Sequence, residues 1–199
     1  PSSGVSTVTT IVCGVDVTDA DEETPDESYV WTNESGDVLG TEASLTLTPS
    51  LVSPEETITC TVTAEDAHGG SDSGTVSIVI VNTGPEISDV ATTPSDDITT
   101  SSTVVCSATA EDDDGGTVDI TYEWTDEDGE VLGSESSLTL KPAMVSPGDE
   151  VTCTVTATDS SGGTTRSTIV IIIINTAPVV STVATSPSSD VGTSTTVVC

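Results

Sequence analysis

The spacing of the cysteines constrains the fold of this chain more than any other feature. The five cysteines are Cys13, Cys60, Cys106, Cys153 and Cys199, and each of the last three follows an earlier cysteine by 93 positions. The two tryptophans, Trp31 and Trp124, have the same offset. Self-similarity at a fixed period predicts an array of equivalent structural units, and a period of this length is that of whole domains.

The repeat divides the chain into three parts. We expect repeat 1 at residues 1–83, without its first strand, a complete repeat 2 at 84–176, and the opening strands of repeat 3 at 177–199. Positions 1 and 187 have the same phase in the repeat. We therefore expect the chain to be a window on a longer array.

The charge balance excludes whole classes of partner. Two basic residues face 34 acidic ones, and the net charge is −32. A phosphate backbone must be neutralised by basic groups, so we expect no nucleic-acid partner, and anionic membrane surfaces are disfavoured for the same reason. The longest apolar run, Ile169–Ile174, is far shorter than the ~20 residues of a spanning helix, so we expect no membrane span.

The hydrophobic pattern predicts an all-β fold. Short runs rich in Val, Ile, Leu and Thr alternate with clusters of Gly, Pro, Ser and Asp, as in sandwiches and barrels. No stretch has a sustained period of 3.6 residues. In repeat 2 the pattern predicts seven strands, at Ile87–Thr92, Ser102–Ala110, Val118–Thr125, Val131–Leu132, Ser136–Leu140, Glu150–Thr158 and Thr164–Ile174.

The order Cys106, Trp124, Cys153, with Cys13, Trp31, Cys60 in the other copy, resembles the pin of immunoglobulin domains. In that pin a disulfide joins two strands over a tryptophan. The resemblance spans the whole chain and implies tandem immunoglobulin-like β-sandwiches of about seven strands each. It also implies the disulfides Cys13–Cys60 and Cys106–Cys153, with Cys199 paired to a residue outside this chain. Zinc ligation or free thiols are the alternatives, and the lack of a CxxC motif or histidine partners disfavours metal.

Two departures separate the chain from antibody domains. The spacing from the first cysteine to the tryptophan is longer than in antibody domains. Ile58 and Val151 replace the tyrosine that usually stands two residues before the second cysteine. The linkers NTGP and NTAP and the segment EDDDGGTVDITYEW look like those of bacterial or archaeal extracellular repeats of the polycystic-kidney-disease-like or cadherin-like groups.

Each predicted core is small. The chain has no Phe, and its aromatic residues are Tyr29, Trp31, Tyr122 and Trp124, which we expect in the two cores. Closing a loop of about 47 residues stabilises a domain by about 4 kcal/mol in the chain-entropy model, so each disulfide matters. Disulfides form in oxidising compartments, and we expect an extracellular or cell-surface location.

Acidic side chains gather in two loops that adjoin the linker in an immunoglobulin-like sandwich. They are Asp112, Asp114, Asp119 and Asp159 in repeat 2 and Asp19, Asp21, Asp26 and Asp66 in repeat 1, with Asn82 in the linker. Several hard oxygen ligands in one place are what Ca²⁺ requires. Calcium is thus the one cofactor the sequence suggests. A saline habitat or a simple need for solubility would also account for the acidity.

Catalytic residues are nearly lacking. His68 is the single histidine, and Ser161 stands in its place in repeat 2. A Ser-His-Asp site would need this loop residue to meet a distant serine, and no acid is singled out for glycoside hydrolysis. We expect that the protein is not an enzyme.

The last predicted strand is apolar on both faces. We therefore expect its residues to be buried against a neighbouring domain or chain and to drive self-association; they are Ile169, Ile171, Ile172, Ile173 and Ile174. The alternative is a central strand partly covered by loops.

Near-identical copies favour a structural role, because a dedicated binding domain usually diverges from its spacers. We expect an extracellular filament, fibre or stalk. The alternative is an adhesin that binds a protein or carbohydrate ligand through loops at one end of the sandwich. A third hypothesis is an accessory region beside a separate catalytic domain.

Overall fold

The computed structural model describes residues 4–184, 186, 193, 194, 196 and 198, so Cys199 lies outside the described residues. All regular structure in the described part of the chain is β-strand. The first sandwich comprises β1 (Thr10–Val12), β2 (Asp26–Thr32), β3 (Val38–Gly40), β4 (Ser44–Thr46), β5 (Thr57–Glu65) and β6 (Ser71–Val79). The second comprises β7 (Glu86–Thr93), β8 (Thr103–Glu111), β9 (Asp119–Thr125), β10 (Val131–Gly133), β11 (Ser137–Thr139), β12 (Glu150–Thr158) and β13 (Thr164–Ile172). These seven strands differ from the predicted bounds by at most two residues.

Each repeat is an immunoglobulin-like sandwich of two antiparallel sheets. In repeat 2 the orders are β10-β9-β12-β13 and β11-β8-β7, and in repeat 1 they are β3-β2-β5-β6 and β1-β4. A short segment before β8 pairs in parallel with the end of the last strand, through Thr99 and Ile174, and Val5 and Ile80 do the same in repeat 1. The prediction of an all-β, tandem immunoglobulin-like fold is confirmed.

Strand alternation sorts the side chains of β12 between core and solvent. Val151, Cys153, Val155 and Ala157 are buried, while the threonines between them lie nearer the surface. This follows from the two-residue period of a β-strand. The buried face packs across the sandwich against β8, so that Val104 and Val155 belong to one core.

Both disulfides are present. Cys13 joins Cys60, Cys106 joins Cys153, and each pair is separated by 47 residues. The tryptophans are buried beside them, and each indole Nε1 donates to a backbone carbonyl at 2.9 Å. The tyrosines lie at the core margin, because Tyr29 and Tyr122 are half-buried and pack against the two clusters.

The last strand corrects one prediction. Ile171 and Ile173 face the core of repeat 2, with 4% and 1% exposure, so the assembly prediction is wrong for these two. Ile169 is partly buried against that core, so the assembly prediction is wrong for it as well. β13 is an edge strand, which contradicts the alternative of a covered central strand. Its outer face is solvent-exposed in this chain, with Val170 at 50%, Ile172 at 59% and Ile174 at 40% exposure.

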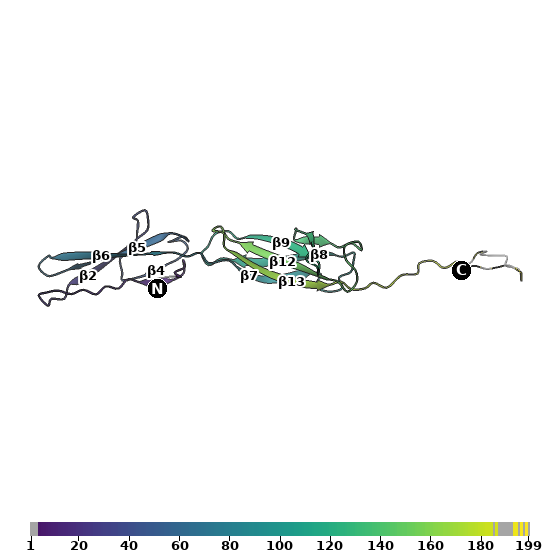
Figure 1. Ribbon diagram of the computed structural model, residues 1–199, viewed down its shortest axis with the longest axis horizontal. Helices are drawn as coiled ribbons and strands as arrows, with labels where there is room; N and C mark the ends of the chain where they lie inside the picture. The colour runs from purple at the N-terminus through teal and green to yellow at the C-terminus, as the bar shows by residue number, and fades with distance from the viewer. Residues whose placement is uncertain (1–3, 185, 187–192, 195, 197, 199) are drawn as a thin grey trace.

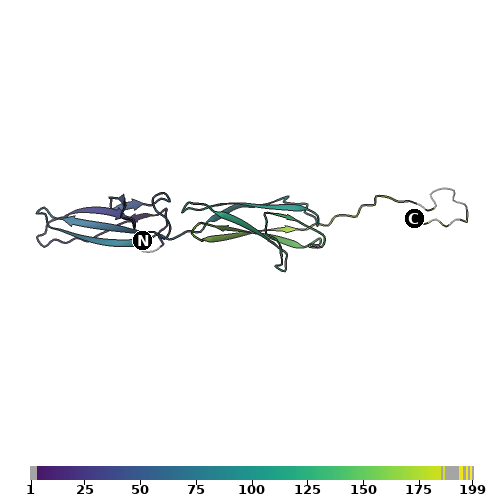
Figure 2. The same cartoon turned by 90° about the horizontal axis from the view of Figure 1, so that it is seen from above.

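The two sandwiches lie end to end along the long axis of the molecule, and the chain after β13 continues along the same direction (Figure 1, Figure 2). Among the described residues there is no helix of the length and apolar character that crossing a membrane requires. The end-to-end arrangement brings the C-terminal end of repeat 1 against the N-terminal end of repeat 2.

Candidate functional site: the joint between the repeats

Two acidic loops of repeat 2 are folded by their own aspartates. The carboxylate of Asp112 accepts the backbone N–H of Asp114 at 2.8 Å. In the second loop Asp159 Oδ1 accepts the N–H groups of Ser161 and Gly163 at 2.8 and 2.9 Å. Such short-range bonds to the backbone stabilise turns. Each of these bonds joins residues of the same loop of repeat 2, and none involves repeat 1.

Asp114 connects these loops to repeat 1. Its Oδ1 accepts the hydroxyl of Thr7 at 2.7 Å, and its Oδ2 accepts both the N–H and the hydroxyl of Thr83, at 2.5 and 2.8 Å. Thr7 is fully buried, and Asp114 is only 7% exposed. Hydrogen bonds to an ionised acceptor are stronger than neutral ones. Asp114 thus ties both the body and the linker of repeat 1 to repeat 2.

Asp159 makes the second connection. Its Oδ2 accepts the side-chain amide of Asn82 at 3.0 Å, and the residue is 7% exposed. Gly163 lies against the side chains of Asp159 and Asn82. A Cβ there would overlap Asp159 Oδ2 and would lie 2.6 Å from Asn82 Nδ2 and 3.1 Å from the Cα of Gly84. The close approach of the linker therefore requires glycine at this position.

A cavity of about 270 Å³ lies beside these contacts. It is lined by Pro49, Ser53, Pro54, Asn82, Asp112, Asp114, Gly115, Gly116, Ser160 and Ser161. Asn82 Oδ1 is buried here and has no hydrogen-bond partner in the structure. Turning the amide around would direct this oxygen at the Asp159 carboxylate, so the orientation of Asn82 is set by its partner. We refer to Thr7, Asn82, Thr83, Asp112, Asp114 and Asp159 as the joint.

The three acids of the joint differ in their electrostatic environment. Burial raises the pKa of Asp112 above its ordinary value of 3.8, and the charges of Asp114 and Asp159 raise it further. Burial also acts to raise the pKa of Asp114, but hydrogen bonds from Thr7 and Thr83 outweigh it, and the pKa is lowered. The amide of Asn82 and the nearby backbone N–H groups lower the pKa of Asp159.

These directions predict how the joint depends on pH. A lowered pKa in the closed joint means that Asp114 and Asp159 favour closure above their ordinary value of 3.8, and that this contribution is lost as the pH falls through the lowered values. The pKa of Asp112 is raised in the closed joint, so the ionised form of Asp112 opposes closure at neutral pH. We expect the two repeats to tumble as one body from pH 7 to about 4, and independently at lower pH. ¹⁵N relaxation measures this, and independent tumbling already at pH 7 would contradict it.

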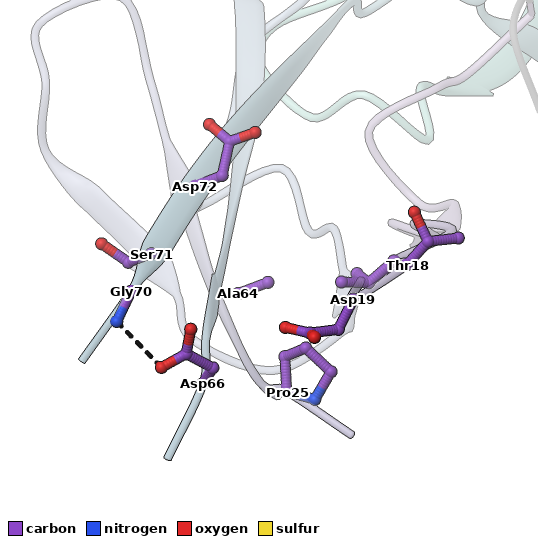
Figure 3. A pocket seen from close by; sticks show the side chains of 9 residues that line it. Thr18, Asp19, Pro25, Ala64, Asp66, Gly70, Ser71 and Asp72 are labelled. Carbon is purple, nitrogen blue, oxygen red and sulfur yellow. Dashed lines mark hydrogen bonds between the residues drawn. The ribbon is translucent and has the colours of Figure 1, made fainter. Parts of the chain in front are cut away.

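Repeat 1 carries the counterparts of these two loops. Asp21 N–H bonds Asp19 Oδ1 at 2.6 Å, and Asp66 Oδ1 accepts the N–H groups of His68 and Gly70 at 2.7 and 2.9 Å. Figure 3 shows Asp19 and Asp66 at the edge of one space, with the Asp66 carboxylate bonded to the N–H of Gly70. That space is a cavity of about 270 Å³, lined by Val17, Thr18, Asp19, Pro25, Ala64, Asp66, Gly70, Ser71 and Asp72.

The predicted metal ligands separate into groups. Asp112, Asp114 and Asp159 lie at the joint, but the three carboxylates are not among the described groups whose ligand atoms all lie within 4.8 Å of one another. Asp26 and Asp119 begin β2 and β9 and are exposed. Within the described residues, three side chains that bring ligand atoms within 4.8 Å of one another are Glu23, Asp66 and His68. His68 Nδ1 lies 3.3 Å from Glu23 Oε2 and is largely exposed.

The threonine donors of the joint were missed by sequence reasoning. Thr7 and Thr83 belong to a chain rich in threonine, so composition does not distinguish them. Their recurrence as Thr100 and Thr176 at the repeat offset is the signal that was available.

Comparisons with other proteins give distant similarities only. Neither a protein-family model nor a curated protein sequence matches the chain. Among solved structures, the amphioxus IgVJ-C2 molecule aligns with a TM-score of 0.39 and 16% identity, over 86% of this chain and 99% of that one. The three N-terminal domains of the highly immunogenic outer capsid protein Hoc of bacteriophage RB49 align with a TM-score of 0.34 and 16% identity, over 87% of this chain and 66% of that one. Because these scores are low, the fold assignment rests on strand order and the disulfides.

Proposed function

We propose that this chain is a structural extracellular repeat protein that forms or decorates a surface filament, fibre or stalk, and that it is not an enzyme. The observation that carries the proposal is the joint, in which Asp114 and Asp159 bind the end of repeat 1 and the linker together. Direct bonds across a linker favour a fixed angle between domains over free rotation. Copies joined in this way would make a stiff rod.

The two disulfides support an extracellular role, because they favour an oxidising location. Each repeat is closed by one disulfide, and disulfides of this kind persist outside the cytoplasm. The net charge of −32 keeps a long extracellular polymer soluble. We therefore propose that the chain works at the cell surface or beyond it.

Calcium is proposed as an additional component of the joint. Asp114 and Asp159 are already satisfied by protein donors, but Asp112 is an incompletely compensated acid, and the buried Asn82 Oδ1 has no partner. These two hard oxygens beside a polar cavity would supply part of the shell of about 6–8 oxygens that Ca²⁺ takes, and water would supply the rest. Asp112 and Asn82 are the residues that would hold it, and the ion would neutralise the negative charge.

Removal of calcium is then expected to destabilise the joint, because an ion that binds only the closed form stabilises it by mass action. Calorimetric titration with Ca²⁺ should show a binding heat for the chain that Asp112→Asn abolishes. Asp19→Asn, the same position in repeat 1, is the matched control and should leave the binding heat unchanged. A chain without any calcium heat, or an equal loss in both variants, would contradict the calcium proposal and leave the protein contacts of the joint intact.

Lateral assembly is proposed through the outer face of β13. We define the edge stripe as Val170, Ile172 and Ile174, which are 50%, 59% and 40% exposed. Repeat 1 has exposed valines at the equivalent positions of Ile172 and Ile174, Val79 at 57% and Val81 at 40%. Apolar rows on an edge strand are an assembly hazard that single proteins usually avoid. In a fibre, a second copy of the chain would pack against this row and bury it.

Electron microscopy tests the structural role and the stripe together. At 1 M NaCl the Debye length is about 3 Å, so repulsion between acidic chains is suppressed, and we expect laterally ordered fibres with a regular axial repeat. The double variant Val170→Thr, Ile172→Thr should lose lateral order. Val131→Thr, on an exposed valine of β10 at the opposite edge of the same sheet, is the control. Isolated flexible strings for every chain would contradict assembly.

An adhesin is the second candidate, and the cavity at the end of repeat 1 away from the joint favours it. This cavity lies among the loops at one end of the sandwich, where Asp19, Asp66 and Asp72 present acidic groups (Figure 3). Loops at the ends of immunoglobulin-like sandwiches commonly carry binding sites. Saturable binding of a protein or carbohydrate, removed by changes at Asp19 and Asp66, would favour this alternative.

A further inference from the structure

The C-terminal end of repeat 2 repeats the surface that repeat 1 uses in the joint. Every residue that repeat 1 contributes to the joint or to its cavity recurs 93 positions later: Thr7 as Thr100, Pro49 as Pro142, Ser53 as Ser146, Pro54 as Pro147, Asn82 as Asn175 and Thr83 as Thr176. The hydrogen-bond donors of the joint and the residues of repeat 1 that line its cavity are therefore both repeated at the far end of repeat 2.

This second surface is open in the structure. Thr7 is fully buried by the loops of repeat 2, whereas Thr100 is half-buried, and Asn175 and Thr176 are exposed. No hydrogen bond joins the side chains of these three residues to another described residue. The same donors that are saturated at one end of repeat 2 are thus unsaturated at the other.

The acceptors show the complementary pattern. Asp114 and Asp159 of repeat 2 are occupied by the end of repeat 1, while their counterparts Asp21 and Asp66 hold the same loop conformation at the exposed end of repeat 1. One difference favours a new contact. Thr48 beside Pro49 becomes Lys141 beside Pro142, which places one of the two basic residues of the chain where the acidic loops of another repeat would lie.

We propose that the C-terminal end of repeat 2 is a docking surface for the N-terminal end of a further copy of the repeat. Thr100, Asn175 and Thr176 donate to the aspartates that correspond to Asp114 and Asp159 in that copy, and Lys141 adds charge complementarity. The donor surface and the acceptor loops of repeat 1 lie at opposite ends of the pair of sandwiches (Figure 1). A head-to-tail contact extends into an open filament when its rotation does not close a ring, and the two sandwiches of this chain lie end to end (Figure 1). The inference rests on the proposed structural role and deepens it by naming the partner of this surface.

Hydrogen exchange tests the proposal on an extended chain, in which residues 94–186 are added after Ser186 in phase with the repeat. In the 199-residue chain the amide of Thr83 is bound to Asp114, so it should exchange slowly, and the amide of Thr176 should exchange fast. In the extended chain we expect the exchange of Thr176 to slow by about 10- to 100-fold, since such bonds protect amides against exchange until the joint opens. Asp114→Asn made only in the added copy should restore fast exchange at Thr176 and leave Thr83 unchanged.

An unchanged fast exchange of Thr176 in a folded extended chain would overturn this inference. Folding of the added copy is checked by protected amides in its own counterpart of β12. Slow exchange at Thr83 in the same sample would show that the joint between repeats 1 and 2 is closed. The proposed structural role would then stand although the docking inference is wrong. Slow exchange at Thr176 that persists with Asp114→Asn in the added copy would also overturn it, because another contact would then be responsible.

Discussion

Removing the disulfide of repeat 2 with the double variant Cys106→Ala, Cys153→Ala is expected to lower the free energy of unfolding of that repeat by about 4 kcal/mol. The bond closes a loop of 47 residues, and the chain-entropy model gives this value for a loop of that length. Single domains are stable by only about 5–15 kcal/mol. The core around the bond has one fully buried aromatic residue, Trp124, with Tyr122 at its margin, so other contacts add little to the stability of this repeat.

Native-state hydrogen exchange measures this change repeat by repeat, because buried strand amides report the free energy of global opening. The amide of Val155 on β12 should lose protection, and that of Val62 on β5 should not. The matched variant Cys13→Ala, Cys60→Ala should show the reverse. A loss below about 1 kcal/mol in either repeat would contradict the view that these small cores depend on their disulfides.

Replacing Asp114 by alanine is expected to open the joint while both repeats stay folded. The substitution removes the acceptor of three bonds from Thr7 and Thr83, and each bond to a charged group contributes about 1.5–3 kcal/mol. Because these bonds share one residue, we expect a net loss on the order of 3 kcal/mol. Small-angle scattering should then show a broader distribution of interatomic distances and a shorter mean length.

The control for this variant is Asp21→Ala, which alters the same loop in repeat 1 but removes no described contact between repeats. Its scattering should equal that of the unaltered chain. A second pair of variants acts by steric overlap. Gly163→Ala places a methyl group against Asp159, Asn82 and Gly84. In the matched variant Gly70→Ala, the methyl group contacts only the Asp66 side chain. Opening by Gly163→Ala but not by Gly70→Ala is expected. Equal effects within either pair would contradict the assigned role of the joint.

The repeat made much of this structure predictable. The cysteine and tryptophan offsets placed both pins, and strand alternation placed the strands of repeat 2 within two residues. The convergence of Asp112, Asp114 and Asp159 beside Asn82 was also predictable, because loops between given strands of a sandwich lie at a known end. These features depend on local pattern and on fold topology.

Other features depended on tertiary contacts that a sequence pattern does not contain. The apolar run at the end of repeat 2 was expected to drive assembly as a whole, but in a strand alternate residues face opposite sides, and Ile171 and Ile173 belong to the core. The donors Thr7 and Thr83 were not singled out, because a hydroxyl becomes a specific partner only when folding brings an acceptor to it. Asp114 is that acceptor, and it lies 107 positions from Thr7.

The central claim is that the two repeats form one stiff body through the joint. Residual dipolar couplings measured for both repeats at neutral pH test it most directly, because they report the orientation of each domain in a common alignment frame. We expect one alignment tensor that fits the couplings of both sandwiches with the orientation shown in Figure 1. Two tensors of clearly different magnitude would mean independent domain motion and would contradict the rod.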